Sequence, residues 1–264
     1  MARLRSSCLL LAGAGALLAG SSLPAAGQVS GLGLAGDALV EMDNVQALPD
    51  AAGRGRRLVI GDGRGVVHVY EQRGRSYDEI WASRYLEGSI CGIQVIDIND
   101  DGLLEIVACT DRGRIHYLDA ENYNTVWTNS PGEYQQISAM LAANVDDDPQ
   151  PELILCADGR LVIYDGRDQF EEWRSEQTGL TTTSMLVADV DGDAMDEIVL
   201  NDGYVFSARV HTLEWQFAEG FGERMGALDL DGDGILELIS EYRSRFIRLF
   251  DVDLRREKSL RANY

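Results

Sequence analysis

An acidic segment of ten residues that occurs four times constrains the fold of this chain more than any other feature. The copies start at Asp97 (DINDDGLLEI), Asn144 (NVDDDPQPEL), Asp189 (DVDGDAMDEI) and Asp229 (DLDGDGILEL), so their starts lie 47, 45 and 40 residues apart. One four-stranded blade of a β-propeller occupies about 40 to 50 residues. The spacing therefore predicts one blade for each copy.

The residues around each acidic segment have the pattern of β-strands. An apolar run precedes each segment and a run rich in β-branched residues follows it, as in SMLVA before Asp189 and EIVL after it. Turn residues and an alternating strand come next. All four tryptophans then fall at one repeat position, at residues 81, 127, 173 and 215. We expect each indole to pack one blade against its neighbour, and a ring of sugar-stacking platforms is the alternative.

These repeats predict an all-β fold, a β-propeller of about five four-stranded blades. It would span residues 28–264, with repeats at about 37–90, 91–138, 139–182, 183–223 and 224–264. In the first repeat DALVEMDN, from Asp37, is the expected inner strand, and VQALPDAAGRGRR, from Val45, is an exposed insertion in place of an acidic loop. Because neither end offers a good closing strand, an open array completed by a partner or a second copy is the alternative. Residues 28–36 could add an edge strand.

The acidic segments have the composition of a metal-binding loop. Side chains with oxygen atoms stand at positions 1, 3, 5 and 9, and alternate residues of a tight loop can turn inward. Hard oxygen ligands suit Ca²⁺, and the absence of His and Cys from these positions argues against zinc or copper. Four carboxylates so close together would repel one another unless a cation or protons neutralise them. We therefore expect three to four calcium sites.

The four loops are not equivalent. Position 6 favours a residue with positive φ, and it holds Gly102, Pro149, Ala194 and Gly234. Proline cannot adopt that conformation, and Asn144 is a neutral ligand at position 1. We therefore predict that the loop at Asn144 is the weakest site and that the loops at Asp97 and Asp229 are the best formed.

The last repeat carries a resemblance to a known family. Phe221 and Gly222 precede residues 225–227 (MGA) and then DLDGDG, which resembles the FG-GAP or VCBS repeats of integrin α-subunit propellers and of many exported bacterial proteins. The likeness covers about residues 38–255, although position 9 is Glu where the family often has Asp and the blades are fewer than seven. The resemblance implies calcium ligands at Asp97, Asn99, Asp101, Glu105, Asn144, Asp146, Asp148, Glu152, Asp189, Asp191, Asp193, Glu197, Asp229, Asp231, Asp233 and Glu237, with the transfer least secure in the loop at Asn144.

A second resemblance concerns the strands between the acidic loops. DRGRIHYLDAENYNTVW, from Asp111, is similar to the strand-and-tryptophan repeat of quinoprotein-like propellers, a family of quinone-dependent dehydrogenases and outer-membrane assembly factors. That pattern has no acidic loop. We interpret the likeness as shared propeller architecture and expect no quinone cofactor.

The first residues have the pattern of an export signal. Arg3 and Arg5 precede an apolar run over residues 8–20, and small residues follow up to Gly27. Thirteen apolar residues are too few for a membrane-spanning helix, which needs about 20. We therefore predict a signal peptide at residues 1–27 and a periplasmic or extracellular protein with no membrane span after cleavage. An uncleaved anchor is the alternative.

Charge and cysteine content add further limits. The formal net charge is −21, so nucleic acid is not an expected partner because the acidic surface repels phosphate. Three cysteines follow the signal segment, Cys91, Cys109 and Cys156, and we interpret them as small apolar residues packed in strands.

The sequence favours binding over catalysis. It contains no GxSxG or HExxH motif, and its three histidines (His68, His116 and His211) stand alone in or beside strand segments. We expect a protein-binding, scaffold or adhesion-type module whose partner is an envelope or extracellular protein. A carbohydrate-binding or polysaccharide-lyase propeller is the alternative, since some lyases are built on FG-GAP-type propellers. The third hypothesis is a subunit that completes its ring only with a partner, either another protein or a second copy, because the ring lacks a closing strand.

Overall fold

The computed structural model describes residues 44–48, 57–146 and 148–260, and these residues form a β-propeller-like array. The described strands make five four-stranded antiparallel sheets, called blades 1 to 5 here, with the strands of each sheet in chain order. The predicted all-β fold of about five blades is confirmed. The predicted signal peptide, the edge strand at 28–36 and the strand at Asp37 lie outside the described residues. No helix within the described residues is long and apolar enough to cross a membrane.

The strands are short and follow the predicted repeats. Blade 1 contains β1 (Val45–Leu48), β2 (Arg57–Gly61), β3 (Val67–Arg73) and β4 (Ser76–Ala82). Blade 2 contains β5 (Ile90–Ile96), β6 (Glu105–Thr110), β7 (Ile115–Asp119) and β8 (Thr125–Thr128). Blade 3 contains β9 (Ile137–Ala143), β10 (Glu152–Ala157), β11 (Arg160–Asp165) and β12 (Glu171–Arg174). Blade 4 contains β13 (Met185–Ala188), β14 (Glu197–Leu200), β15 (Tyr204–Ser207) and β16 (Leu213–Gln216). Blade 5 contains β17 (Arg224–Leu228), β18 (Glu237–Tyr242), β19 (Phe246–Asp251) and β20 (Arg256–Lys258).

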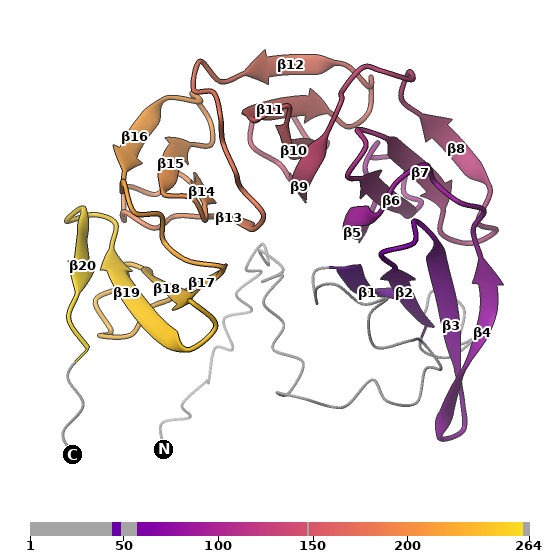
Figure 1. Ribbon diagram of the computed structural model, residues 1–264, viewed down its shortest axis with the longest axis horizontal. Coiled ribbons are helices and arrows are strands. Elements are labelled where there is room, and N and C mark those ends of the chain that lie inside the picture. Colours follow the sequence, from indigo (N-terminus) through magenta and orange to yellow (C-terminus); the bar gives the residue numbers. More distant parts are fainter. Residues whose placement is uncertain (1–43, 49–56, 147, 261–264) are drawn as a thin grey trace, which may run out of the picture.

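The blades are arranged in an arc, with the first strand of each blade nearest the centre and the fourth at the rim (Figure 1). Consecutive inner strands contact one another, from β1 through β5, β9 and β13 to β17. Blades 5 and 1 stand on either side of an opening in the arc of described strands. The described part of the chain is therefore an open array.

The inner strand of blade 1 differs from the prediction. Val45–Leu48 form β1 and pair with β2, from Val45 opposite Ile60 to Leu48 opposite Arg57. The interpretation of these four residues, and of Arg57 at the start of β2, as part of an exposed insertion was wrong, because Arg57 is buried. The prediction failed because VQAL is only four residues long and is followed directly by Pro, Gly and Arg residues, which are typical of an exposed loop.

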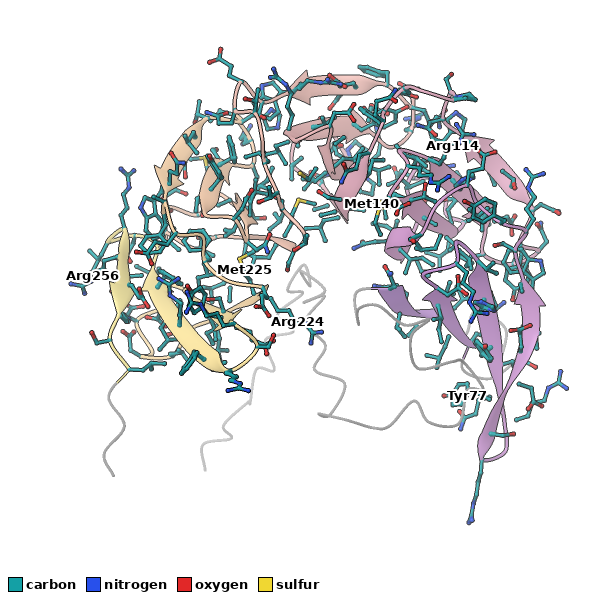
Figure 2. All side chains as sticks on the ribbon, in the orientation of Figure 1. Tyr77, Arg114, Met140, Arg224, Met225 and Arg256 are labelled. Atoms are coloured by element: carbon teal, nitrogen blue, oxygen red, sulfur yellow. The ribbon has the colours of Figure 1, made fainter. Side chains whose placement is uncertain are left out.

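Side chains fill the space between neighbouring blades, where the core lies (Figure 2). All six residues of β6 and of β10 are buried, as expected for strands covered on both faces. Met140 of β9 packs on β5 at Gly92, where an added Cβ would lie 2.9 Å from the Met140 Cβ. The blades therefore meet through close contacts that a larger residue at Gly92 would disrupt.

The tryptophans join each blade to the next, which confirms the packing interpretation. Ring centroids lie 5.0 Å apart for Trp81 and Tyr123, 6.2 Å for Trp127 and Tyr164, 6.3 Å for Trp173 and Phe206, and 6.4 Å for Trp215 and Phe250. In each pair the second ring belongs to the following blade. Each indole also packs against one of four buried apolar clusters.

The cysteines lie in strands, as the sequence suggests. Cys109 in β6 and Cys156 in β10 are buried, and Cys91 in β5 is half-buried. The sulfurs of Cys91 and Cys109 lie 2.9 Å apart across neighbouring strands, and burial raises the pKa of the Cys91 thiol well above its usual value.

Replacing Trp127 by alanine is expected to lower the free energy of unfolding by about 3 kcal/mol, because the blade 2–blade 3 contact loses its indole. Urea denaturation measures this loss. Val126→Ala is the matched control, since this neighbour on β8 is exposed and its truncation should change stability by less than about 0.5 kcal/mol. Equal losses in the two variants would contradict the packing role.

Candidate metal centre

The four acidic loops occupy the same place in blades 2 to 5. They span residues 97–105, 144–152, 189–197 and 229–237, and each joins the first strand of its blade to the second. The glutamate at position 9 is always the first residue of the second strand. The repeated topology therefore puts all four loops at the same end of their blades.

The glutamate at position 9 anchors every loop. Glu105, Glu152, Glu197 and Glu237 are only 1 to 4% exposed. One oxygen of each carboxylate accepts the backbone N–H of position 2, from Ile98 at 3.1 Å, Val145 at 2.7 Å, Val190 at 2.9 Å and Leu230 at 2.8 Å. This bond fixes the side chain and leaves the second oxygen available to a cation.

The aspartate at position 1 organises the turn in three of the loops. Asp189 accepts the backbone N–H groups of Gly192 at 2.7 Å and Ala194 at 3.0 Å. Asp229 accepts those of Gly232 at 2.7 Å and Gly234 at 3.1 Å. Asp97 accepts those of Asp101 at 3.0 Å and Gly102 at 2.8 Å. Side-chain bonds to nearby backbone N–H groups are typical of Asp in tight turns.

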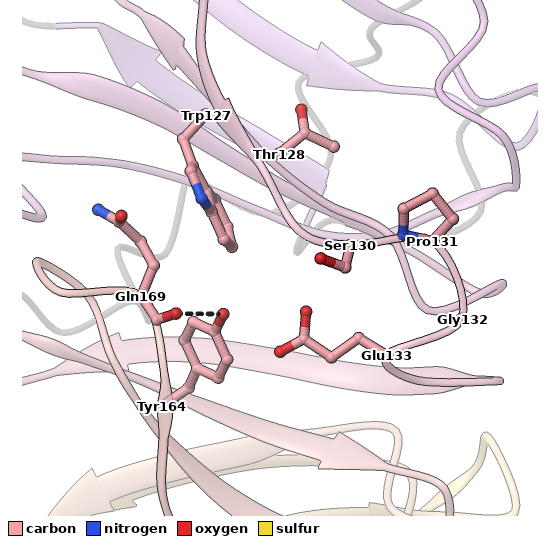
Figure 3. Close-up of a pocket in the computed structure, with 8 residues that line it drawn as sticks. All are labelled: Trp127, Thr128, Ser130, Pro131, Gly132, Glu133, Tyr164 and Gln169. Atoms are coloured by element: carbon pink, nitrogen blue, oxygen red, sulfur yellow. Dashed lines mark hydrogen bonds between the residues drawn. The ribbon is translucent and has the colours of Figure 1, made fainter.

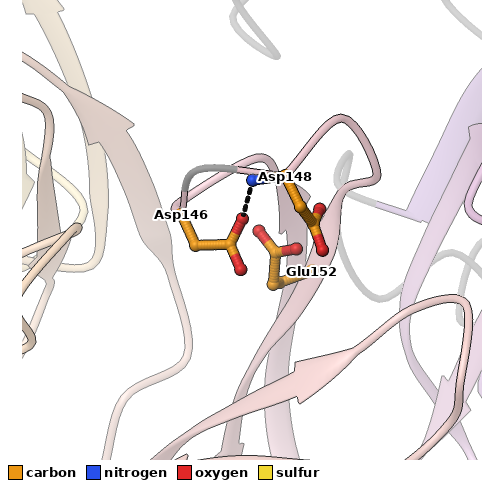
Figure 4. A group of neighbouring side chains, drawn as sticks. All are labelled: Asp146, Asp148 and Glu152. Carbon is orange, nitrogen blue, oxygen red and sulfur yellow. Dashed lines mark hydrogen bonds between the residues drawn. The ribbon is translucent and has the colours of Figure 1, made fainter.

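Carboxylates converge in three of the loops. The groups are Asp146, Asp148 and Glu152 (Figure 4), then Asp189, Asp191 and Glu197, and finally Asp229, Asp231 and Glu237. Within each group, one oxygen from every residue lies within 4.8 Å of the others. Oxygen ligands of Ca²⁺ lie about 2.3 to 2.6 Å from the ion, so ligands on opposite sides of it are about 5 Å apart. Each group therefore has the dimensions of a shared cation site.

The loop at Asp97 differs from the others in its residue at position 3. It is not among the convergent groups of acidic side chains found in the described residues, because its side chain at position 3 is an amide and not a carboxylate. Position 3 is Asn99, whose carbonyl oxygen accepts the Asp101 N–H at 3.0 Å. The Asp101 carboxylate accepts the Leu103 N–H at 2.8 Å. The side chains at positions 3 and 5 of the fourth-blade loop make the same bonds to the loop backbone, so the two loops fold alike.

The loop at Asn144 adapts to proline at position 6. Pro149 has no N–H for the side chain at position 1 to accept, and position 1 is an amide. The Asn144 Nδ2 instead donates to the Asp148 carbonyl oxygen at 2.5 Å. The convergent group accordingly uses positions 3, 5 and 9, whereas the other two use positions 1, 3 and 9.

Position 6 has positive φ in the other three loops, as the sequence predicts. The angle is 85° at Gly102, 69° at Ala194 and 91° at Gly234. Only Ala194 carries a Cβ, which makes this backbone conformation unfavourable. The fourth-blade loop therefore stores strain that the second- and fifth-blade loops avoid.

The glutamates at position 9 of blades 2 to 4 are buried close to other carboxylates, which makes their ionised form unfavourable. Burial raises the pKa of Glu105 and of Glu152 to about 7, and that of Glu197 to about 8, and neighbouring aspartates add to the shift. Burial and the adjacent loop carboxylates also raise the pKa values of Glu172 and Glu214 on the fourth strands. Such groups favour a bound proton or a bound cation.

A pocket of about 520 Å³ lies between blades 2 and 3 (Figure 3). Trp127 stands on one side, Tyr164 on the other, and Glu133 points into the space between them. The Tyr164 hydroxyl donates to the Gln169 carbonyl oxygen at 2.9 Å. Apart from Trp127, sequence reasoning did not identify these residues, because the pocket forms only when two blades meet.

Comparisons with known proteins identify the fold. No protein-family model matches the chain, and no curated protein sequence matches it. Among solved structures, BBS1N in complex with ARL6DN has a TM-score of 0.59 at 14% identity, over 82% of this chain and 67% of that one. Sqt1 of Saccharomyces cerevisiae has a TM-score of 0.60 at 14% identity, over 81% of this chain and 60% of that one. BamB from Moraxella catarrhalis has a TM-score of 0.50 at 19% identity, over 82% of this chain and 63% of that one. The chain therefore has a β-propeller-type fold.

The raised glutamate pKa values predict an unusual dependence of stability on pH. Without divalent ions the folded chain holds protons on Glu105, Glu152 and Glu197 that the unfolded chain releases above about pH 4.5, the ordinary glutamate value. The stability of the ion-free protein should therefore fall as the pH rises from about 4.5 to 8. Melting temperatures in chelator test this, and Glu197→Gln should weaken the dependence. A rise in melting temperature over that range would contradict it.

Relief of strain at position 6 should stabilise the fourth-blade loop. Ala194→Gly is expected to increase the free energy of unfolding by about 0.5 kcal/mol, because glycine tolerates the φ of 69°. Gly102→Ala, the reciprocal change in blade 2, should lower it by about 1 kcal/mol. Chemical denaturation measures both, and a loss of stability in Ala194→Gly would count against the strain.

Proposed function

We propose that this chain is an exported, calcium-stabilised propeller that binds a protein in the cell envelope or outside the cell. The observation that carries the proposal is the recurrence of the acidic loop at one end of four consecutive blades, with three groups of converging carboxylates. The export signal predicted for residues 1–27 supports the location, because Ca²⁺ is plentiful outside the cytoplasm.

The residues that would hold the ion are the converging carboxylates of blades 3 and 4, together with the side chains of the Asp97 loop in blade 2. Their oxygen-only donor sets suit a hard cation. Bound Ca²⁺ would neutralise the buried glutamates and join the first and second strands of a blade. The FG-GAP or VCBS resemblance of the sequence supports the same interpretation, since those repeats bind calcium in the equivalent loops.

Binding fits the surface better than catalysis does. The chain has a net charge of −21, so a partner with a basic surface would be attracted and guided to it. The structurally similar BBS1N was crystallised with a protein, ARL6DN. A propeller offers broad faces for such contacts, and one side of blade 5 has no neighbouring blade in the described structure.

A carbohydrate ligand is the second candidate, and the pocket between blades 2 and 3 favours it. An indole beside the Glu133 carboxylate and the Gln169 amide is a combination that can stack on a sugar ring and bond to its hydroxyls. Trp127 is already used in blade packing, which leaves only part of its surface for a ligand. We therefore rank this function below protein binding.

The calcium proposal predicts that Ca²⁺ raises the melting temperature of the purified chain. One site saturated at 100 times its dissociation constant adds about 2.7 kcal/mol. Titration calorimetry and thermal denaturation measure the effect. The control variant carries Asp189→Asn, Asp191→Asn and Glu197→Gln, which should remove one site and part of the gain. Absence of both heat and stabilisation would overturn the proposal.

The partner is then sought with the chain as bait, in calcium and in chelator. A bound protein that is lost in chelator and retained less well by the triple variant supports the scaffold function. Release by soluble glycans, and loss of that release in Glu133→Gln, would instead favour the carbohydrate function.

A further inference from the structure

The fifth-blade loop already contains a cation from the protein itself. Lys258, the only lysine in the sequence, lies on β20. Its Nζ is 2.5 Å from Glu237 Oε1, 2.6 Å from Asp251 Oδ1 and 3.2 Å from Asp231 Oδ2. Glu237 and Asp231 belong to the convergent group of this loop. The ammonium therefore bridges two of the three carboxylates that would hold a metal ion.

This arrangement is particular to blade 5. Among the ion pairs between described residues, those of Lys258 are the only ones that reach a side chain at position 1, 3, 5 or 9 of an acidic loop. The equivalent glutamates of blades 2 to 4 have no such bond to a basic side chain in the described structure.

The strand register shows where Lys258 stands in the repeat. It lies opposite Leu249, two residues before the end of β19. In blades 2 to 4 the residue two places before the end of the third strand lies opposite the tryptophan: Tyr117 opposite Trp127, Ile163 opposite Trp173, and Val205 opposite Trp215. Lys258 therefore occupies the tryptophan position of the last blade.

The exchange of tryptophan for lysine has a physical reason. The four indoles pack on the blade that follows, and no sheet follows β20 in the described structure. An indole at residue 258 would therefore have no following blade to pack on among the described strands. A lysine can lay its aliphatic stem along the sheet and extend its ammonium into the neighbouring acidic loop.

We propose that the Lys258 ammonium takes the cation position of the fifth-blade loop, so that this blade is closed without a divalent ion. Asp251 also pairs with Arg256, at 3.0 Å, and Arg248 pairs with Glu257, at 2.7 Å, so three basic residues fasten the three-residue strand β20. A divalent ion at this loop would have to displace one of these attachments. The comparison with the other loops rests on the proposed calcium function.

Ion counting tests the proposal with Ca²⁺ alone as the probe. Equilibrium dialysis of the full chain should find one more bound ion per chain in Lys258→Met than in the wild type. Lys258→Arg keeps the positive charge and should bind the wild-type number. Arg245→Met removes one charge from the exposed β18–β19 turn, at the other end of the blade, and should also bind the wild-type number. Equal numbers in Lys258→Met and the wild type would overturn the proposal.

A second test uses no Lys258 variant, and a third measures stability and not ion number. In the wild type, Asp229→Asn should leave the number of bound ions unchanged, and loss of one ion would overturn the proposal. In chelator, Lys258→Met should lower the melting temperature by about 5 °C, because the buried Glu237 carboxylate loses its cationic partner, whereas Arg245→Met should not. An unchanged melting temperature in Lys258→Met would also overturn it.

The chelator measurement separates the two proposals. If the wild type binds no Ca²⁺ at all, the calcium function fails, while the loss of stability in chelator still decides whether Lys258 neutralises the loop. If the wild type binds Ca²⁺ and Lys258→Met neither gains an ion nor loses stability, only the role of Lys258 fails.

Discussion

The buried glutamate at the end of each acidic loop is the group on which the rest of the site depends. Its backbone bond to position 2 satisfies one oxygen, and burial makes the remaining negative charge costly. Three neutralising species are available to such a group: a proton, a metal ion and an ammonium. Blade 5 contains the ammonium of Lys258, whereas the glutamates of blades 2 to 4 have pKa values raised to about 7 or 8. The loops thus share one geometry and differ in how their charge is balanced.

Two repeated contacts stabilise the array, one within each blade and one between neighbouring blades. The glutamate bond works within a blade, where it fastens the loop to the second strand. The tryptophan contact works between blades, where it joins the rim of one blade to the next. Stability in such an array is approximately the sum of terms from each unit and each interface. No blade follows blade 5 in the described structure, and there lysine occupies the tryptophan position.

The sequence predicted the blades, the loops and the place of the tryptophans, because each of these repeats at a fixed spacing. It did not predict β1, since VQAL is short and lies beside strong turn signals. It also did not show that positions 3, 5 and 9 converge in the third blade, where Asn144 donates to the Asp148 carbonyl oxygen. The role of Lys258 depends on the register between β19 and β20. The sequence does not show this register, because the last repeat has no tryptophan to mark the position. Features that repeat along the sequence were therefore predictable, whereas contacts between residues far apart in the sequence were not.

The open arc has a consequence for how this molecule would come apart. Each inner strand touches only the inner strands before and after it, and blades 5 and 1 each have one neighbour in the described structure. Unfolding of the described array by heat, pulling force or proteolysis would therefore begin at a terminal blade and continue one blade at a time. The unfolding rate of the array would then depend on the contacts that hold blades 1 and 5. In blade 5 these include the contacts of β20, a strand of three residues.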